Sequence, residues 1–167
     1  TTQMYAIRQH RWATEVLTAL EIPSGFLPAV VAPGTILGET PQALVRETDL
    51  DQPAKAIATA SHDTSSAIAA IPHLDNQSVF IWSGTCCFIG LEISAPIINS
   101  QALALNLTNE GGVDNKTNLQ KILTGLWLLQ ECQRQWHLQG SDYSWEALLT
   151  FGEQAQPFQI LIDPDAP

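Results

Sequence analysis

The chain has 167 residues, and 45% of them are hydrophobic, which is enough for one packed core or for two small lobes. It carries 7 basic and 17 acidic residues, for a formal net charge of −10, so it has no basic stripe to replace the counterions of a nucleic acid. It contains no run of about 18 apolar residues that could span a membrane, and we expect no signal peptide. Composition therefore argues against nucleic-acid and membrane partners and predicts a cytoplasmic protein.

The cysteines and histidines argue against a metal site. The three cysteines, Cys86, Cys87 and Cys132, form an odd set without a CxxC spacing, so we expect neither a disulfide framework nor a structural zinc site. Three of the histidines, His10, His73 and His137, also lack partners at metal-ligand spacing. We therefore expect reduced cysteines, and histidines that lie at the surface or in the core.

The N-terminal third predicts one helix followed by irregular structure. Apolar residues recur with helical spacing over residues 11–20 and stop before Pro23, which predicts a helix there. Residues 23–41 are rich in Pro and Gly and predict an ordered crossing with many turns, whose apolar side chains require burial. Residues 42–52 are polar and acidic and predict a surface loop.

A strand and a helix are predicted around the most informative polar segment of the chain. Residues 55–60 form a short apolar stretch typical of a strand, and residues 65–71 form a run of small residues typical of a tightly packed helix. The polar residues between them, Ser61 to Thr64, mark a strand end followed by a helix start. Enzymes of the α/β class commonly place their chemistry at such a point.

The remainder predicts three strands and two helices. The predicted strands are 79–82, 86–91 and 103–107, and the predicted helices are 118–137 and 144–153, the last with Ser144 as its N-cap. The composition changes near residues 72–77, which predicts a boundary between a unit of residues 1–72 and a unit of residues 73–167.

Asp63 is the main candidate for catalysis. A carboxylate at the end of a strand, flanked by the hydrogen-bonding residues His62 and Thr64, suits a base that accepts a proton from a substrate hydroxyl. The structural alternative is that Asp63 or Thr64 caps the helix that follows, because both residue types are favoured N-caps.

Two polar turns are candidate ligand sites. Ser83-Gly84-Thr85 lies between two predicted strands, where Gly lets backbone N–H groups approach a phosphate and Thr adds a hydroxyl donor. The same pattern is also an ordinary hairpin turn. The turn Asn109–Gly112 has the same two interpretations, a ligand-binding loop or a simple change of chain direction.

Taken together, these segments resemble the rhamnulokinase branch of the FGGY family of carbohydrate kinases. Six matching stretches occur in family order along the chain: Pro33–Gly38, Ala60–Thr64, Ser83–Thr85, Thr108–Gly112, Gly125–Cys132, and Pro157-Phe158 with Ile162–Asp165. The resemblance implies an α/β chain with the actin/hexokinase-like (ribonuclease H-like) ATPase fold. It also implies an internal fragment that holds the end of the first lobe (1–72) and the start of the second (73–167) and is inactive by itself.

The family resemblance also assigns roles to individual residues. It makes Asp63 the general base and implies that His62 and Thr64 contact the sugar. It implies that Gly84 and Thr85 meet the phosphates of ATP, and that Gln130 contacts the nucleotide. The implied reaction transfers the γ-phosphoryl group of Mg²⁺-ATP to a hydroxyl of a ketose such as rhamnulose or a related deoxyketose.

Two positions depart from the family pattern. Cys86 stands where the family usually has Trp, and Ile122 stands where the family has an Asn that is implied to contact the sugar. Ile122 cannot hydrogen-bond a hydroxyl, so a related sugar is an alternative substrate. Two other functions remain open: an inactive module that binds sugar or nucleotide, and a hydrolase in which Asp63 and His62 act on water.

Overall fold

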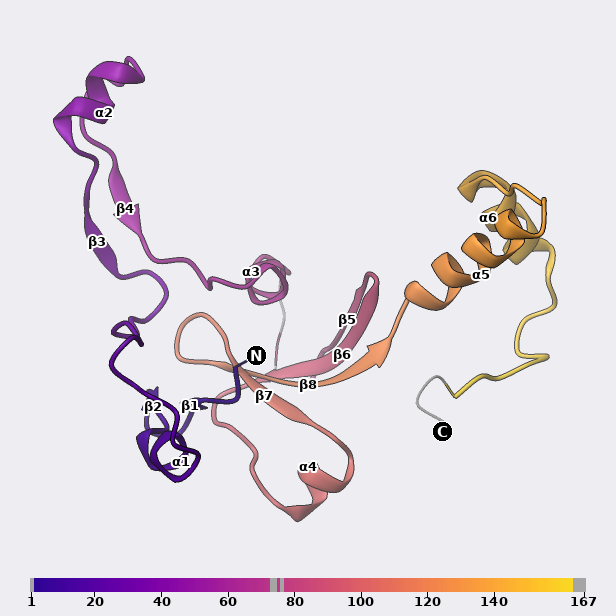
Figure 1. Ribbon diagram of the computed structural model, residues 1–167, viewed down its shortest axis with the longest axis horizontal. Helices are drawn as coiled ribbons and strands as arrows, with labels where there is room; N and C mark the ends of the chain where they lie inside the picture. The colour runs from indigo at the N-terminus through magenta and orange to yellow at the C-terminus, as the bar shows by residue number, and fades with distance from the viewer. Residues whose placement is uncertain (1, 73–74, 76, 164–167) are drawn as a thin grey trace. The chain divides into compact units, whose positions relative to one another are not determined.

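The computed structural model describes residues 2–72, 75 and 77–163, and Figure 1 labels its helices and strands in chain order. Packing divides the chain into unit 1, Thr1–Phe80 with Gly90–Lys121, and unit 2, Ile81–Ile89 with Ile122–Pro167. Residues 90–121 therefore pack with the N-terminal residues. The boundary predicted near residues 72–77 lies partly outside the described residues and stays a prediction.

A four-stranded sheet is the main β-structure of the chain. Its strands, in the order β5-β6-β8-β7, are β5 (Val79–Ser83), β6 (Cys86–Ile93), β8 (Thr117–Thr124) and β7 (Thr108–Gly111). The two strands predicted on either side of the Gly84 turn are confirmed as β5 and β6. Strand β7 pairs antiparallel with β8, which places Glu110 opposite Asn118 and Thr108 opposite Gln120.

Strand β8 corrects the predicted helix 118–137, because only the second half of that range is helical. Residues 118–124 belong to β8, and helix α5 runs from Trp127 to Leu138. Residues 117–120 of β8 are all buried, and a strand that is covered on both faces need not alternate between polar and apolar residues. The spacing of its apolar residues resembled a helix by coincidence.

The predicted strand 103–107 is also wrong, because helix α4 (Ser100–Ala104) begins before it and β7 begins after it. Asn99 is the N-cap of α4, and its Oδ1 accepts a hydrogen bond from the Ala102 N–H at 2.7 Å. This cap starts a helix in a segment whose alternating leucines favour a strand. The local signal that decides the structure therefore lies upstream of the leucines.

The predicted helices around residues 11–20 and 65–71 are confirmed in unit 1. Helix α1 (Thr14–Ala19) follows a short antiparallel pair, β1 (Tyr5–Ala6) and β2 (Arg11–Trp12). Helix α3 runs from Asp63 to Ala69 and buries Thr64, Ser65 and Ile68. The small residues of α3 allow this close packing, and they fix the start of the helix against the interior of unit 1.

The segment 36–57 forms an antiparallel pair with an intervening helix. Strand β3 (Ile36–Glu39) pairs with β4 (Lys55–Ile57), which confirms the first half of the strand predicted at 55–60. The surface loop predicted at 42–52 is wrong, because helix α2 (Gln42–Glu47) forms there and buries Val45. Its single buried apolar position makes it too weakly patterned to recognise by periodicity.

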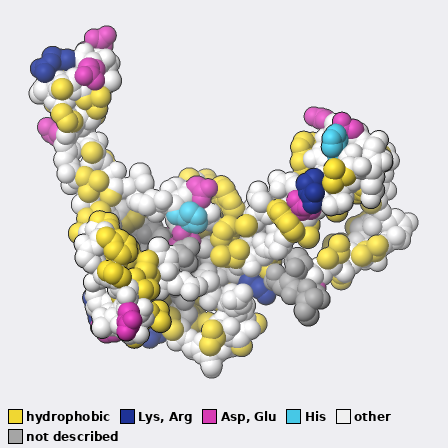
Figure 2. Space-filling model, viewed as in Figure 1, with side chains coloured by type: hydrophobic (Ala, Val, Ile, Leu, Met, Phe, Trp, Pro, Cys, Tyr) yellow, Lys and Arg dark blue, Asp and Glu magenta, His cyan; other side chains and the backbone are white. Residues whose placement is uncertain are grey.

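The predicted burial of apolar side chains in residues 23–41 is also wrong. Phe26 is 67% exposed and Leu37 is 60% exposed, and Figure 2 shows hydrophobic side chains at the surface along the segment of β3 and β4. A two-stranded pair buries little by itself, and every residue of both strands is exposed.

Unit 2 contains α5 and α6 (Trp145–Gln154). The predicted helix 144–153 and its N-cap are confirmed, because Ser144 Oγ accepts from the Ala147 N–H at 3.3 Å. Edge-to-face contacts of Tyr143 with Trp136 and Phe151, at centroid distances of 5.5 and 5.8 Å, connect the two helices. Neither helix has a fully buried residue.

Among the described residues, no helix combines the length and the apolar character needed to cross a bilayer.

Candidate functional site

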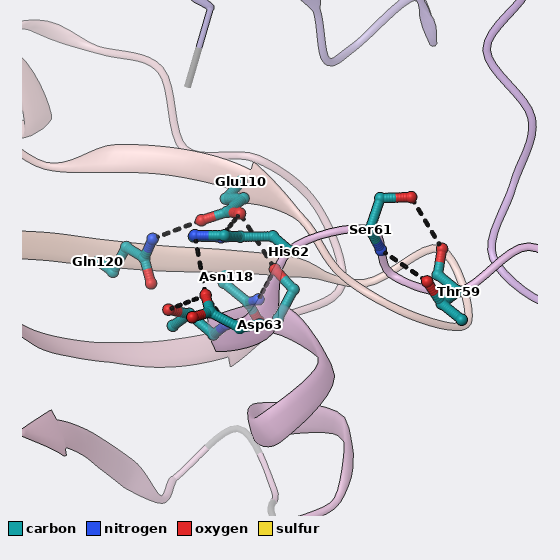
Figure 3. Close-up of polar contacts among 9 residues, drawn as sticks. Thr59, Ser61, His62, Asp63, Glu110, Asn118 and Gln120 are labelled. Atoms are coloured by element: carbon teal, nitrogen blue, oxygen red, sulfur yellow. Dashed lines mark hydrogen bonds and ion pairs between the residues drawn. The ribbon is translucent and has the colours of Figure 1, made fainter. Parts of the chain in front are cut away.

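A polar cluster in unit 1 joins the start of α3 to strands β7 and β8 (Figure 3). We call it the Glu110 cluster, and its members are His62, Asp63, Ser65, Glu110, Asn118 and Gln120. Because Glu110 faces Asn118 across the ladder, and side chains of a strand alternate between faces, these two and Gln120 share one face of the sheet. Residues 45 or more positions apart thus come together.

The Glu110 carboxylate is the centre of this cluster. It is 12% exposed, and it lies 2.5 Å from His62 Nδ1 through Oε1. Ser65 Oγ donates to Oε1 at 3.2 Å, and Gln120 Nε2 donates to Oε2 at 2.7 Å. Burial of a carboxylate is unfavourable unless donors replace its water. The three groups that converge on Glu110 satisfy this requirement and fix the carboxylate in place.

Two buried amides support the cluster from β8. Asn118 and Gln120 are each 1% exposed, and Asn118 Nδ2 donates to Ser65 Oγ at 3.3 Å. Among the described residues, Asn118 Oδ1 and Gln120 Oε1 have no hydrogen-bond partner. The amide nitrogens therefore point to the Glu110–Ser65 side of the cluster, where they extend the network.

Asp63 differs from Glu110 because it is 80% exposed. Its Oδ1 accepts from the Thr64 N–H at 2.7 Å and lies 3.3 Å from His62 Nε2. Asp63 Oδ2 has no partner among the described residues. The N-cap position of α3 is His62, and Asp63 is the first helical residue, where an acidic side chain interacts favourably with the helix dipole. The carboxylate is thus anchored by one oxygen, and the other is open to solvent.

His62 and Thr64, which the resemblance makes sugar contacts, are both engaged within the protein. His62 is 44% exposed, and each of its ring nitrogens faces a carboxylate, Nδ1 facing Glu110 and Nε2 facing Asp63. Thr64 is 2% exposed, and its hydroxyl lies 3.4 Å from Asp63 Oδ1. Sugar contacts by these two residues stay predictions.

A cavity of about 450 Å³ lies in unit 1 beside the segments that carry His62 and Glu110. Trp12, Ala32, Ser61, Gly111 and Lys116 are among its lining residues. Ser61 precedes His62 in the chain and Gly111 follows Glu110. Its volume is within the range of small-molecule sites, and its walls combine apolar surface with a few polar groups.

The Gly84–Thr85 turn in unit 2 is held by its own backbone. The Gly84 N–H donates to the Cys86 carbonyl at 3.0 Å, so this N–H is already paired within the turn. The Gly84 carbonyl accepts from the Leu126 N–H at 2.9 Å, and the Thr85 carbonyl accepts from Trp127 at 3.2 Å. These hydrogen bonds connect the turn to the start of α5.

Gly125 makes this connection sterically possible. A Cβ at Gly125 would lie 2.5 Å from the Gly84 carbonyl oxygen and 2.8 Å from the carbonyl carbon of Cys86. Backbone atoms at these distances cannot be avoided by a change of rotamer. Gly125 therefore permits a close backbone approach, which is the use of glycine that a ligand-binding turn often requires.

The predicted nucleotide contacts of unit 2 lie at its surface. Thr85 and Gln130 are both exposed, and within the described part of the chain neither side chain has a hydrogen-bond partner. Gln130 belongs to the first turn of α5. The hydroxyl of Thr85 and the amide of Gln130 are therefore free to bind a ligand, whereas the Gly84 N–H is not.

Sequence reasoning placed Glu110 only within the candidate ligand-binding turn Asn109–Gly112, and it did not place Asn118 or Gln120 in a site. In the structure, residues 108–111 form strand β7 rather than a turn. Asn118 and Gln120 fell within a predicted helix. An acidic residue within a strand, followed eight and ten residues later by two amides, was the available signal, because an antiparallel pair brings such residues together.

The chain is similar to carbohydrate kinases. The model of the FGGY family of carbohydrate kinases, C-terminal domain, matches residues 79–167, which is more than half of the chain. Rhamnulokinase of Bacteroides thetaiotaomicron is 36% identical over 165 residues, which are 99% of this chain and 33% of that protein. Rhamnulokinase of Enterococcus faecalis is 36% identical over 167 residues, 100% of this chain and 33% of that protein. The chain thus spans about a third of the length of these relatives.

The fold is also similar to that of a solved sugar kinase. The ligand-bound xylulose kinase of Lactobacillus acidophilus matches with a TM-score of 0.69 and 18% identity, over 93% of this chain and 30% of that one. The predicted α/β class with the actin/hexokinase-like fold is thereby confirmed. From the family model, which covers residues 79–167, it follows that the chain belongs to the FGGY family of carbohydrate kinases.

Proposed function

We propose that the chain supplies the catalytic base and part of the ATP site of a sugar kinase that phosphorylates a ketose hydroxyl. Rhamnulose or a related deoxyketose is the proposed sugar, because rhamnulokinases are similar to this chain over 99% of its length or more. The observation that carries the proposal is the exposed carboxylate of Asp63, which is anchored through Oδ1 and open at Oδ2. A general base requires this combination of fixed position and free lone pair.

The proposed reaction uses Asp63 as a proton acceptor. As the sugar oxygen bonds to the γ-phosphorus of ATP, its O–H bond breaks and the proton moves to Asp63 Oδ2. The bond between the γ-phosphorus and the bridging oxygen breaks, and ADP leaves. Positioning and charge stabilisation provide most of the rate enhancement in phosphoryl transfer, so the chain's role is to orient the base.

ATP is the proposed phosphoryl donor, and Mg²⁺ accompanies it. The exposed Thr85 hydroxyl and Gln130 amide suit contacts to phosphate and nucleotide, respectively. Among the described residues, no group of three His, Cys, Asp or Glu side chains has a metal-binding arrangement. This fits Mg²⁺, which commonly binds through phosphates and one or two carboxylates rather than in a protein cage. When bound, the ion would neutralise charge on the phosphates.

The proposal also covers the domain organisation and the cellular location of the protein. We propose that residues 1–72 end the first lobe of the kinase and residues 73–167 begin the second, and the start of the family match at residue 79 supports this division. A cytoplasmic location, where ATP is supplied, is part of the proposal.

The substrate preference depends on Ile122. Its side chain is 43% exposed at β8 and offers no hydrogen bond where the family resemblance implies an amide. A site that lacks a polar partner discriminates less strongly for the corresponding hydroxyl. We therefore propose a related deoxyketose alongside rhamnulose as a substrate, and parallel assays of both sugars distinguish them.

The decisive experiment replaces Asp63 by Asn in the full-length protein that carries this chain. Phosphate transfer from ATP to rhamnulose and related ketoses is measured. We expect kcat of Asp63→Asn to fall by about 10²- to 10⁴-fold, the usual contribution of a general base, with a small change in KM for the sugar. Asp51→Asn is the matched control, because Asp51 is an exposed aspartate of unit 1 outside the cluster.

Other outcomes would point to other functions. If both wild type and Asp63→Asn bind the sugar but neither consumes ATP, the protein is an inactive sugar- or nucleotide-binding module. Activity that is independent of ATP would instead indicate a hydrolase. Equal kcat values for wild type and Asp63→Asn would exclude Asp63 as the base.

A further inference from the structure

We infer that Glu110 is a positioning residue for Asp63 and that it acts through the imidazole of His62. This inference rests on the proposed function, because it assigns Asp63 as the base. In this arrangement Glu110 orients the ring of His62. The ring of His62 and the backbone N–H of Thr64 then hold Asp63 Oδ1, and Asp63 Oδ2 receives the proton of the sugar hydroxyl.

Glu110 itself is fixed by its surroundings. It lies in β7, which pairs over four residues with the buried strand β8. Ser65 donates to one carboxylate oxygen and Gln120 to the other. These contacts come from two different elements, α3 and β8, so neither rotation of the side chain nor a small shift of one element frees the carboxylate. Glu110 thus provides a rigid reference point.

Glu110 sets the orientation of the His62 ring. The contact between Nδ1 and Oε1 is 2.5 Å, and a carboxylate accepts but does not donate hydrogen bonds. The ring is thereby held by Nδ1 on the buried side. Its opposite nitrogen, Nε2, lies 3.3 Å from Asp63 Oδ1 and pairs with that carboxylate when both ring nitrogens carry a proton. A hydrogen bond at one ring nitrogen commonly determines what the other can do.

The exposed carboxylate of Asp63 needs a second contact to fix its position. Its side chain is 80% exposed, and a single hydrogen bond from the Thr64 N–H would leave the carboxylate free to turn. The second contact, with His62 Nε2, falls on the same oxygen. Both anchors therefore hold Oδ1 and leave Oδ2 as the oxygen that takes the hydroxyl proton.

The test is Glu110→Ala in the full-length protein, with Glu110→Gln as a second variant that keeps the side-chain volume and one acceptor oxygen. We expect kcat to fall by about 10- to 100-fold in Glu110→Ala, as for other small misplacements of a catalytic group. KM for the sugar should stay within about twofold, because positioning of the base affects the reacting state. Glu110→Gln should recover part of kcat, because its amide oxygen can still accept from His62.

Glu92→Ala is the matched control. Glu92 is also a nearly buried glutamate of unit 1, with an exposure of 8%. It forms an ion pair with Lys116, the residue before β8. It lies outside the Glu110 cluster, so its removal should leave kcat unchanged even if the protein becomes less stable. A fall in kcat of similar size in both variants would show a general loss of folding and overturn the inference.

A double-mutant cycle tests the route through His62. If Glu110 acts through the imidazole, the double variant Glu110→Gln/His62→Gln should have the same kcat as His62→Gln alone. Additive losses would mean that Glu110 acts independently of His62, which contradicts the inference. Glu110→Gln decides the question if Glu110→Ala does not fold.

The outcome is separable from that of the proposed function. If Asp63→Asn loses turnover while Glu110→Ala and Glu110→Gln keep the kcat of wild type, Asp63 is the base and Glu110 has no positioning role. If Asp63→Asn keeps full turnover, the proposed base is wrong, and the inference about Glu110 falls with it.

Discussion

The two units differ in where their side chains are buried. All buried side chains among the described residues belong to unit 1, and half of them are polar or charged: Leu17, Val45, Ile68, Phe80, Ala102 and Leu119 are apolar, and Thr64, Ser65, Glu92, Thr117, Asn118 and Gln120 are polar or charged. Unit 2 has no such residue in its described part. Its turn at Gly84 is held by backbone hydrogen bonds, and its candidate ligand contacts are exposed.

This difference matches the demands of the proposed chemistry. A base must be held within a fraction of an ångström of its working position, and buried, paired polar groups provide that rigidity. The proposed nucleotide contacts, Thr85 and Gln130, would bind groups that bring their own charge and Mg²⁺. Exposed side chains on a backbone-fixed turn suffice for such binding. Substitutions in the two units should therefore have different consequences.

The largest effect on stability is expected from Gly90→Ala, in the buried part of the sheet. A Cβ at Gly90 would lie 2.8 Å from Gln120 Cβ and would overlap the Leu119 carbonyl. Because β6 and β8 would have to separate, we expect the free energy of unfolding to fall by about 1–3 kcal/mol. Hydrogen exchange of the full-length protein should become faster in peptides from residues 108–121.

Gly152→Ala is the control for this prediction. A Cβ at Gly152 would have no atom within 4 Å, and Ala is favoured over Gly within a helix by about 0.5–1 kcal/mol. Exchange in unit 1 should be unchanged in this variant. Equal protection of residues 108–121 in Gly90→Ala and wild type would contradict the proposed close approach of β6 and β8.

A smaller and more local effect is expected from Gly125→Ala in unit 2. The new Cβ would lie 2.5 Å from the Gly84 carbonyl oxygen, so α5 must move away from the turn. We expect KM for ATP to rise several-fold, while KM for the sugar and the exchange rates of residues 108–121 stay at wild-type values. Steady-state kinetics with each substrate varied in turn provides the measurement, and a rise confined to the sugar KM would contradict the division of roles.

The smallest effect is expected at the exposed pair of Arg11 and Glu15, which are 2.5 Å apart with side chains 48% and 69% exposed. The Arg11 hydrogen bond lowers the pKa of Glu15 from 4.5 to about 2. Because the folded pKa lies below the unfolded one, the pair stabilises α1 fully above pH 4.5, and the contribution is lost as the pH falls through about 2.

The change Arg11→Gln should return the pKa of Glu15 toward its ordinary value of 4.5. Carboxyl chemical shifts at about pH 4, near that usual value, should show an ionised Glu15 in wild type and a partly protonated one in Arg11→Gln. Arg46→Gln, which removes a charge from α2 instead, should leave the titration of Glu15 unchanged. An identical titration in Arg11→Gln and wild type would show that the pair does not form. Stability should change little, as is usual for exposed ion pairs.

Local signals in the sequence were sufficient for several elements. The small-residue run after Asp63 predicted α3, the Gly84 turn predicted the β5–β6 pair, and Ser144 predicted the start of α6. In each case the deciding residues lie within a few positions of the element.

Long-range contacts decided what could not be predicted. The buried segment 117–120 is a strand only because β6 and β7 flank it, and its own residues equally suit a helix. Glu110 lies 48 positions from His62, so no local pattern links them. The expected burial of Phe26 and Leu37 failed for a related reason, because an apolar side chain does not specify which part of a protein will cover it.

Strand β8 contributes to two separate features of the chain. Its first half presents Asn118 to Ser65 and Gln120 to Glu110, and the residue after its end is Gly125, where a Cβ would meet the turn at Gly84. Because side chains alternate along a strand, one residue inserted between Asn118 and Gln120 would turn one of the two amides to the opposite face of the sheet. The length of this segment therefore matters to the Glu110 cluster as much as the identity of its two amides.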